Sequence, residues 1–155
     1  MQPSRQPRKT LRSDAQALVE ACAGWNSRLA ARRISQFLDG EMGGLGLTAA
    51  QVGMMAQIAA AGDDTLSALA RRTGLEQSTL SRNLRTLEGE GLIEIVTAEN
   101  DLRRRAVWLT ETGARRLEAA IPVWRKALAK LARRLSPALA RRLADEAEAL
   151  IEDRP

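Results

Sequence analysis

One pair of strand-like segments interrupts a sequence whose apolar residues otherwise recur at helical spacing. β-Branched and aliphatic residues dominate positions 92–97 and 105–110, and a polar, charged segment at 98–104 separates the two runs. Two such runs joined by a polar turn are typical of a β-hairpin. Before and after this hairpin, apolar residues recur every three or four positions, which is the period of an amphipathic α-helix. The sequence therefore predicts a mainly α-helical fold with a single two-stranded hairpin.

Two short helices joined by a tight turn precede the hairpin. Thr65 can cap the start of the first helix, and Gly74 can adopt the left-handed conformation that ends it. The second helix is expected over residues 77–89, and its apolar residues lie at spacings of four and three, namely Leu80, Leu84 and Leu87. A further helix begins upstream at the capping box Thr48-Ala-Ala-Gln51. Together with the hairpin, this order predicts a winged helix-turn-helix.

The segments that flank this winged region are expected to form a short basic arm and the helices of a dimer. Together with the winged region we expect them to make up one domain. Residues 1–12 carry four basic residues, two prolines and no acid, so we expect a disordered basic arm. Dimerisation helices are expected over 13–46 and 112–155, around a DNA-binding winged region at 47–111. The first of these helices is expected to be a single long one that starts at Ser13-Asp14 and stops near Asp39, before a glycine-rich stretch.

The C-terminal segment carries the clearest sign of a partner chain. Its apolar residues repeat at spacings of four and three, like the seam of a coiled coil, at Leu117, Ile121, Trp124, Leu128, Leu131 and Leu135. Pro122 lies inside this repeat, so we expect a kink near residues 118–122. A last amphipathic helix is expected to start at Ser136-Pro137. Because a two-helix layer cannot bury such a seam alone, the sequence predicts a homodimer.

Composition excludes several classes of chemistry. The chain has 155 residues, a net charge of +5, no histidine, no tyrosine and a single cysteine. Without histidine, the chain has no His-based acid–base catalysis, no Ser-His-Asp nucleophile and no His-liganded zinc. We therefore expect no enzyme activity, no metal and no cofactor. Since the sequence has no signal-peptide core and no apolar run of about 18 residues, we expect a cytoplasmic protein that does not enter a membrane.

The outer face of the helix at 77–89 carries side chains suited to DNA. They are Gln77, Ser78, Ser81, Arg82 and Arg85, and all can form hydrogen bonds while none is acidic. Glutamine suits adenine edges, arginine suits guanine edges or phosphate, and serine suits either kind of contact. A polar outer face is also what any amphipathic helix presents to solvent, so this pattern alone leaves both interpretations open.

The tip of the hairpin carries three consecutive arginines at 103–105. Like charges on a protruding loop repel one another unless something negative lies beside them. Asp101 can hold the guanidinium of Arg103 extended, and a narrow minor groove attracts such an arginine. Arg104 is a further candidate for a DNA contact. The alternative interpretation is an ordinary solvated charged turn.

Three motifs in this order resemble the MarR-type winged-helix transcription regulators. They are LTAAQ at 47–51, STLSR at 78–82, and DLR at 101–103 followed by LTETG at 109–113. The resemblance extends over about residues 15–150 and includes the order of all the elements. It implies that the first and last helices of two chains interlock into a dimer. It also implies that many members release DNA when a small aromatic or other apolar ligand binds.

The resemblance assigns roles to individual residues of this chain. Ser78, Ser81 and Arg82 match positions that enter the major groove. Arg103 matches the wing residue that enters the minor groove, with Asp101 as the partner that orients it. The sequence departs from the family pattern at Arg85-Thr86, where an acidic and then a basic residue are common, and at Ile95, where a basic residue is common. These departures affect which DNA sequence is bound.

Two residues of the N-terminal segment match functional positions in some members of the family. Cys22 lies roughly where organic-peroxide sensors keep their reactive cysteine. Those sensors place tyrosines beside the thiol and this chain has none, so a packing role is favoured over redox sensing. Trp25 could line the ligand cleft between the dimer helices and the winged region, although a packing role is the alternative.

Taken together, these features predict a sequence-specific, DNA-binding transcription regulator. We expect a ligand-responsive repressor that binds double-stranded DNA at a pseudo-palindromic operator as a homodimer, and the repressor role follows from what is commonest in the family. One alternative is a helical protein-interaction module of the same fold that no longer binds DNA, which the presence of Arg82 and Arg103 disfavours. Another is a nonspecific architectural binder, which selection of sites from random DNA would distinguish.

Overall fold

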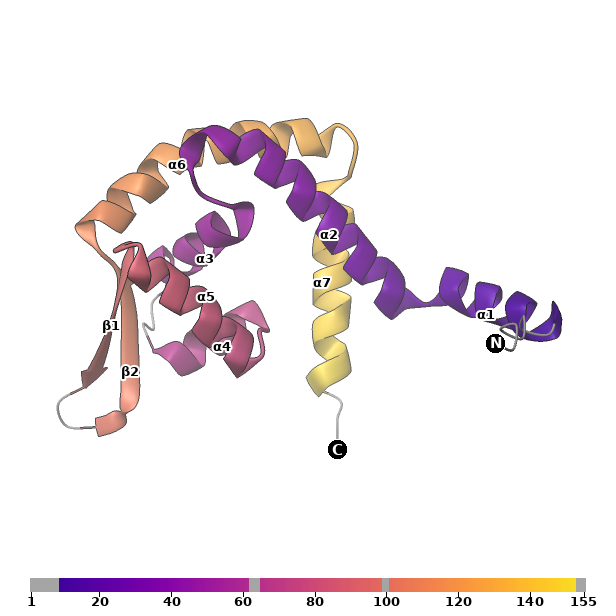
Figure 1. The fold of residues 1–155 in the computed structure, drawn as a ribbon, viewed down its shortest axis with the longest axis horizontal. Helices are drawn as coiled ribbons and strands as arrows, with labels where there is room; N and C mark the ends of the chain where they lie inside the picture. Colours follow the sequence, from indigo (N-terminus) through magenta and orange to yellow (C-terminus); the bar gives the residue numbers. More distant parts are fainter. Residues whose placement is uncertain (1–8, 62–64, 99–100, 153–155) are drawn as a thin grey trace, which may run out of the picture. The chain divides into compact units, whose positions relative to one another are not determined.

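The computed structural model describes residues 9–61, 65–98 and 101–152 of the chain. The described elements follow the predicted order, with one two-stranded sheet, and confirm a mainly α-helical winged helix-turn-helix fold (Figure 1). The chain divides into two compact units, Met1–Phe37 and Leu38–Pro155. The elements are α1 (Lys9–Ala21), α2 (Ala23–Met42), the 3-10 helix η1 (Gly43–Leu45), α3 (Ala49–Ala59), α4 (Leu66–Thr73), α5 (Gln77–Gly89), β1 (Ile93–Ala98), β2 (Asp101–Leu109), α6 (Glu111–Ala132) and α7 (Pro137–Glu152).

The winged region is built around a core to which α3, α4, α5 and the hairpin all contribute. In the second unit, α3 contacts α4 and β2, α5 contacts β1, and α6 contacts both α3 and β2 (Figure 1). The apolar face predicted for α5 is the buried one, since Leu80, Leu84 and Leu87 are almost inaccessible to solvent. The other elements bury aliphatic and methionine side chains, including Val52, Met55, Ile58, Leu69, Ile93 and Val107. This burial fixes which face of α5 remains outside.

Threonine side chains cap three helices of the winged region. Thr48 and Gln51 form the predicted capping box at the start of α3, since each side chain bonds the backbone of the other. The predicted cap at Thr65 also forms, because its hydroxyl accepts from the backbone N–H of Ala68 at 3.2 Å. Thr110 caps α6 in the same way. After α4, Gly74 has a φ of 62°, as expected for a glycine in the left-handed conformation.

The hairpin is longer than the sequence pattern indicates. The segment 98–104 was expected to be a turn, but β1 extends to Ala98 and β2 already begins at Asp101. The strands pair antiparallel from Ile93 opposite Leu109 to Thr97 opposite Arg105, and the register shifts between Thr97 and Ala98. Backbone hydrogen bonds between strands do not require apolar side chains, so pairing continues into the polar segment after the buried residues end.

The N-terminal segment differs from the prediction of one long helix. Residues 9–12, which were assigned to a disordered arm, begin α1, because lysine, leucine and arginine favour helix and no proline lies between Pro7 and Pro122. The rest of the predicted arm, residues 1–8, lies outside the described residues. A break at Cys22 then separates α1 from α2. The Cys22 Sγ accepts from the backbone N–H of Trp25 at 3.4 Å, so this residue caps the start of α2.

The end of α2 also lies beyond the predicted stop. The helix passes Gly40 and continues to Met42. A glycine inside a helix costs only about 1 kcal/mol relative to alanine, whereas Leu38 and Met42 are both buried in the second unit. Burial of these two side chains therefore outweighs the local preference of glycine for a helix end.

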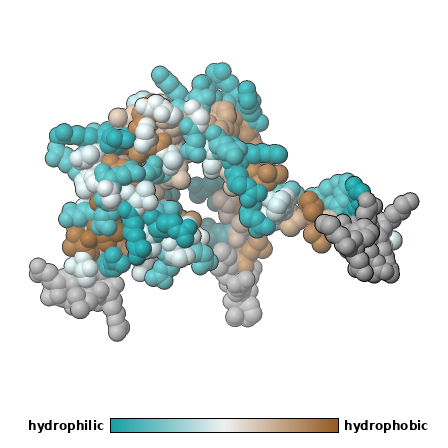
Figure 2. All heavy atoms as spheres, viewed as in Figure 1, coloured by the Kyte–Doolittle hydropathy of each residue, from teal (hydrophilic) through white to brown (hydrophobic). Residues whose placement is uncertain are grey.

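The C-terminal helices leave apolar residues on the surface. α6 is helical through Pro122, and its axis changes direction along its length, as a proline inside a helix would produce (Figure 1). Of the predicted seam, Leu117 is buried, whereas Ile121 and Leu128 are exposed. On α7, three leucines are exposed, namely Leu139, Leu143 and Leu150. Hydrophobic side chains also reach the surface among the hydrophilic ones in the space-filling view (Figure 2).

Candidate nucleic-acid interface

The outer face of α5 is the predicted DNA-binding face, and the structure leaves most of it exposed. Ser78, Arg82 and Arg85 lie at spacings of four and three residues, so they share one stripe of the helix, and all three are exposed. Gln77 is also exposed, and Ser81 is half-buried beside the stripe. The buried leucines of α5 hold this stripe outward because they occupy the opposite face of the helix. The structure thus brings together the five residues of α5 that the sequence singled out.

These polar side chains have no partners in the part of the chain that the structure describes. Among the residues that the structure describes, no hydrogen bond or ion pair involves the side chain of Gln77, Ser78, Ser81, Arg82 or Arg85. The stripe itself carries no acid. Two exposed arginines without an ion-pair partner among the described residues present a positive, hydrogen-bonding surface of the kind that phosphates and guanine edges accept.

The start of α5 differs from the starts of α3, α4 and α6. Glu76 is its N-cap residue, and no side chain bonds the first-turn N–H groups. Helix N-termini carry a partial positive charge, and open N–H groups at that end can donate hydrogen bonds to a phosphate oxygen. The first-turn N–H groups of α5 are therefore open to an acceptor, although the exposed carboxylate of Glu76 lies at the same end of the helix.

The wing places its predicted residues on β2. The backbones of Asp101, Arg103 and Arg104 belong to this strand, while their side chains lie outside the described part of the chain. Closer to the base of the hairpin, the indole N–H of Trp108 donates to a carboxylate oxygen of Glu94, its cross-strand neighbour, at 3.3 Å. The roles of Asp101, Arg103 and Arg104 at the minor groove stay predictions.

Cys22 and Trp25 belong to the first compact unit. Cys22 is half-buried, and its Sγ caps the start of α2, while the expected packing role stays a prediction. Trp25 is 47% exposed, and the Arg32 guanidinium lies 5.8 Å from its ring centroid, within the range of a cation–π contact. Its place in a ligand cleft and any redox role of Cys22 stay predictions.

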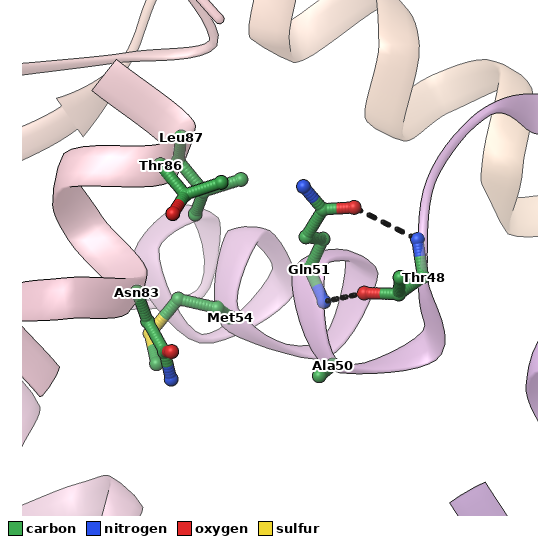
Figure 3. A pocket seen from close by; sticks show the side chains of 7 residues that line it. All are labelled: Thr48, Ala50, Gln51, Met54, Asn83, Thr86 and Leu87. Carbon is green, nitrogen blue, oxygen red and sulfur yellow. Dashed lines mark hydrogen bonds between the residues drawn. The ribbon is translucent and has the colours of Figure 1, made fainter. Parts of the chain in front are cut away.

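A pocket lies between α3 and α5 (Figure 3). It has a volume of about 220 Å³ and is lined by three small or apolar side chains and four polar ones, namely Ala50, Met54, Leu87, Thr48, Gln51, Asn83 and Thr86. Gln51 projects between the two helices, and its side chain also bonds Glu90 just after α5. This link was not predicted from the sequence, although the motif Leu-Thr-x-x-Gln contains the residue.

The described residues form neither a metal-ligand cluster nor a membrane-spanning helix. Within residues 9–61, 65–98 and 101–152, no three His, Cys, Asp or Glu side chains are grouped as a metal site would require. No described helix is both long and apolar enough to cross a membrane.

Comparisons with known proteins agree with this geometry. Residues 45–104 match the model of a protein family described as the MarR family. The chain is similar to the M. tuberculosis transcriptional regulator MosR in complex with DNA, with 32% identity, a TM-score of 0.77, and coverage of 86% of this chain and 99% of that one. No curated protein sequence matches significantly.

Two more distant structures share the fold. The S. aureus MepR–DNA complex has 21% identity and a TM-score of 0.67, covering 86% of this chain and 98% of that one. A mutant of E. coli MarR complexed with operator DNA has 23% identity and a TM-score of 0.69, covering 86% of this chain and 96% of that one.

Proposed function

Because this chain belongs to the MarR family of winged-helix, DNA-binding transcription regulators, we propose that it is a sequence-specific repressor that acts as a homodimer in the cytoplasm. Its task is then binding rather than catalysis. The observation that carries the proposal is the outer stripe of α5, where Ser78, Arg82 and Arg85 are exposed and have no partner within the described chain. The MosR and MepR structures named above contain DNA, which supports the same assignment.

In this proposal α5 and the wing make different contacts with DNA. Five side chains of α5 contact base edges and phosphates in the major groove, namely Gln77, Ser78, Ser81, Arg82 and Arg85. The edges exposed in the major groove differ among all four base pairs, so these contacts can distinguish them. Arg103, oriented by Asp101 and assisted by Arg104, enters the minor groove, which offers shape and negative potential but little base information. Sequence specificity therefore comes mainly from α5.

The homodimer is supported by the apolar surface of the C-terminal helices. Leu128 on α6 is 41% exposed, and Leu139 and Leu143 on α7 are more so. A second copy that covers these side chains would remove them from water, at about 25 cal/mol per Å² of apolar surface. Two copies related by a two-fold axis would present two α5 helices to half-sites about 10 base pairs apart, which is the reason to expect a pseudo-palindromic operator.

Selection of binding sites from a pool of random double-stranded DNA tests the proposal. We expect enrichment of one sequence with two inverted half-sites centred about 10 base pairs apart. Arg82→Ala should lose the selected preference, whereas Arg115→Ala should keep it. The control removes the same charge from an exposed, ion-paired position on α6. If the folded protein enriches no sequence, the chain is instead the interaction module or a nonspecific binder, and retention on unselected DNA separates these two.

The dimer has its own test by sedimentation. We expect the wild type to sediment as a dimer at micromolar concentration and Leu128→Glu to sediment as a monomer, since a carboxylate cannot be buried in an apolar interface without a partner. Ala119→Glu, at an exposed position of the same helix, is the matched control because it adds the same single negative charge. A monomeric wild type would contradict the homodimer.

Ligand responsiveness is the last part of the proposal, and it rests on the resemblance to family members that release DNA. Trp25 supplies an exposed aromatic surface for a small aromatic or apolar ligand. Titration of the DNA complex with benzoate and with indole, as an anionic and a neutral aromatic probe, should release DNA from the wild type and less from Trp25→Ala. Equal release from both proteins would show that Trp25 does not belong to the ligand site.

A further inference from the structure

Two motifs that do not lie on the DNA-binding face converge on one short segment. This segment, Glu90-Gly91-Leu92, ends α5 and begins the wing, and we call it the α5–wing joint. The side chain of Gln51, from the motif at the start of α3, donates to both carboxylate oxygens of Glu90 at 3.2 and 3.3 Å. The hydroxyl of Thr110, from the motif at the start of α6, donates to the carbonyl of Gly91 at 2.6 Å.

The joint has a defined backbone geometry of its own. Gly91 has a φ of 69°, and its N–H donates to the carbonyl of Glu88 at 2.9 Å. The N–H of Leu92 donates to the carbonyl of Leu87, also at 2.9 Å. This pair of bonds around a left-handed glycine is the Schellman motif, which ends a helix in one conformation. The direction in which the chain leaves α5 is therefore fixed locally.

Gln51 connects the joint to α3 through an amide whose orientation is set. Its Oε1 accepts from the N–H of Thr48 at 2.8 Å, which completes the capping box (Figure 3). Its Nε2 is therefore the atom left to bond Glu90. An amide nitrogen donating to a carboxylate is a charge-assisted hydrogen bond. The same side chain thus caps α3 and holds the end of α5.

Thr110 connects the joint to α6 in an analogous way. Its hydroxyl accepts from the N–H of Gly113 at 3.0 Å while donating to Gly91, and its own N–H donates to the carbonyl of Leu92 at 3.1 Å. The first turn of α6 also lies directly on the joint, since a Cβ on Gly113 would be only 1.9 Å from the Leu92 oxygen. Only glycine permits this approach of two backbones.

We propose that the α5–wing joint sets the orientation of α5 relative to α3 and α6, with Gln51 and Thr110 as positioning residues for DNA recognition. The proposal rests on the function proposed above. Because α6 carries apolar surface assigned to the dimer, an α5 helix held rigidly to α6 also fixes the separation of the two α5 helices. The joint then determines which half-site spacing the dimer accepts, although neither residue lies on the stripe of α5 that faces DNA.

The first test uses two variants of Thr110. Thr110→Ser keeps both hydrogen bonds of the hydroxyl, whereas Thr110→Val has nearly the same shape and loses both. Binding is measured on the duplex that the wild type selects and on duplexes with the half-sites one base pair closer or farther apart. Thr110→Val should bind the selected duplex about three- to tenfold more weakly and discriminate less between spacings, and Thr110→Ser should match the wild type.

A purely structural cap would give another result. In that case Thr110→Val would unfold more easily, but it would keep the wild-type affinity and the wild-type ratio between spacings. That outcome would overturn the proposal.

The second test exchanges the amide and the carboxylate between Gln51 and Glu90. Gln51→Glu keeps the acceptor of the capping box, since glutamate serves there as well, but places a carboxylate beside Glu90. It should weaken binding to the selected duplex. Adding Glu90→Gln restores a donor–acceptor pair with the roles reversed, so the double variant should recover affinity. Equal affinities of the wild type, the single variant and the double variant would contradict a positioning role for Gln51.

A measurement without DNA separates failure of the joint from failure of the proposed function. Spin labels at Glu88→Cys on α5 and Glu118→Cys on α6, in a Cys22→Ser background, report the distance between the two helices. Thr110→Val should broaden this distance distribution, and Thr110→Ser should leave it narrow. If Thr110→Val leaves the distribution unchanged, the joint does not orient α5. If it broadens while the wild type selects no DNA sequence, the joint is supported and the proposed function fails.

Discussion

The side chains on the inner face of α5 are buried in the core, whereas those on the outer face are largely exposed and have no partner among the described residues. Leu80, Leu84 and Leu87 are almost fully buried on the inner face. Among the described residues of the whole chain, no buried side-chain nitrogen or oxygen lacks a partner. On the outer face, Arg82 and Arg85 are exposed and form no hydrogen bond or ion pair within the described chain. The fold thus depends on one face of α5, and the other face is available to a partner.

This contrast predicts opposite sensitivities. Substitutions on the inner face and at the supports of α5 should lower the free energy of unfolding, and substitutions on the outer face should change DNA binding at constant stability. The expected effects on stability decrease from the buried leucines, through the contacts of the joint and the helix caps, to the arginine stripe.

The largest effect is expected at Leu84, which is 1% exposed. Leu84→Ala removes buried methyl groups and leaves a cavity, so it should lower the free energy of unfolding by about 2–5 kcal/mol. Urea denaturation followed by circular dichroism measures this change. A loss below about 1 kcal/mol would mean that the inner face of α5 does not support the fold.

A smaller effect is expected at Gly113, where a new Cβ would meet the Leu92 carbonyl. Gly113→Ala should lower the free energy of unfolding by about 1–3 kcal/mol, since backbone atoms must move apart. Gly53→Ala is the matched control, because Gly53 is inside α3 and a Cβ there meets nothing within 4 Å. The control should stabilise the protein by about 0.5–1 kcal/mol, and the same sign for both variants in urea denaturation would contradict this account.

The cap on α3 should contribute less. Thr48→Ala removes the acceptor for the Gln51 N–H and should lower the free energy of unfolding by about 1 kcal/mol, while Thr48→Ser should retain most of the wild-type value. Thermal unfolding of the three proteins under one set of conditions measures this difference. Equal melting temperatures for the alanine and serine variants would show that the capping box adds nothing.

Short-range signals explain which parts of the fold could be predicted from the sequence. The Thr48 capping box, the left-handed Gly74 and the leucine spacing of α5 each depend on residues a few positions apart. The polar stripe of α5 that we propose binds DNA follows from the same periodicity, because the polar positions lie opposite the leucines.

The remaining features depend on contacts between distant residues or on a single atom. The break at Cys22 arises because a thiol can cap a helix, which the apolar pattern around it conceals. α2 continues past Gly40 because Met42 becomes buried, and no local preference indicates this. The bond from Gln51 to Glu90 joins residues 39 positions apart, so the α5–wing joint could be recognised only in the folded chain.

The smallest effect on stability is expected at Arg82. The same residue gives the most direct test of DNA recognition by the outer face of α5. Arg82→Ala should leave the free energy of unfolding within about 0.5 kcal/mol of the wild type, since an exposed side chain without partners is removed. Titration on the selected operator and on random DNA, at several salt concentrations, should show a loss of about 1–3 kcal/mol on the operator and a smaller gap between the two DNAs. Unchanged operator affinity and an unchanged gap in Arg82→Ala would contradict recognition of DNA by the outer face of α5.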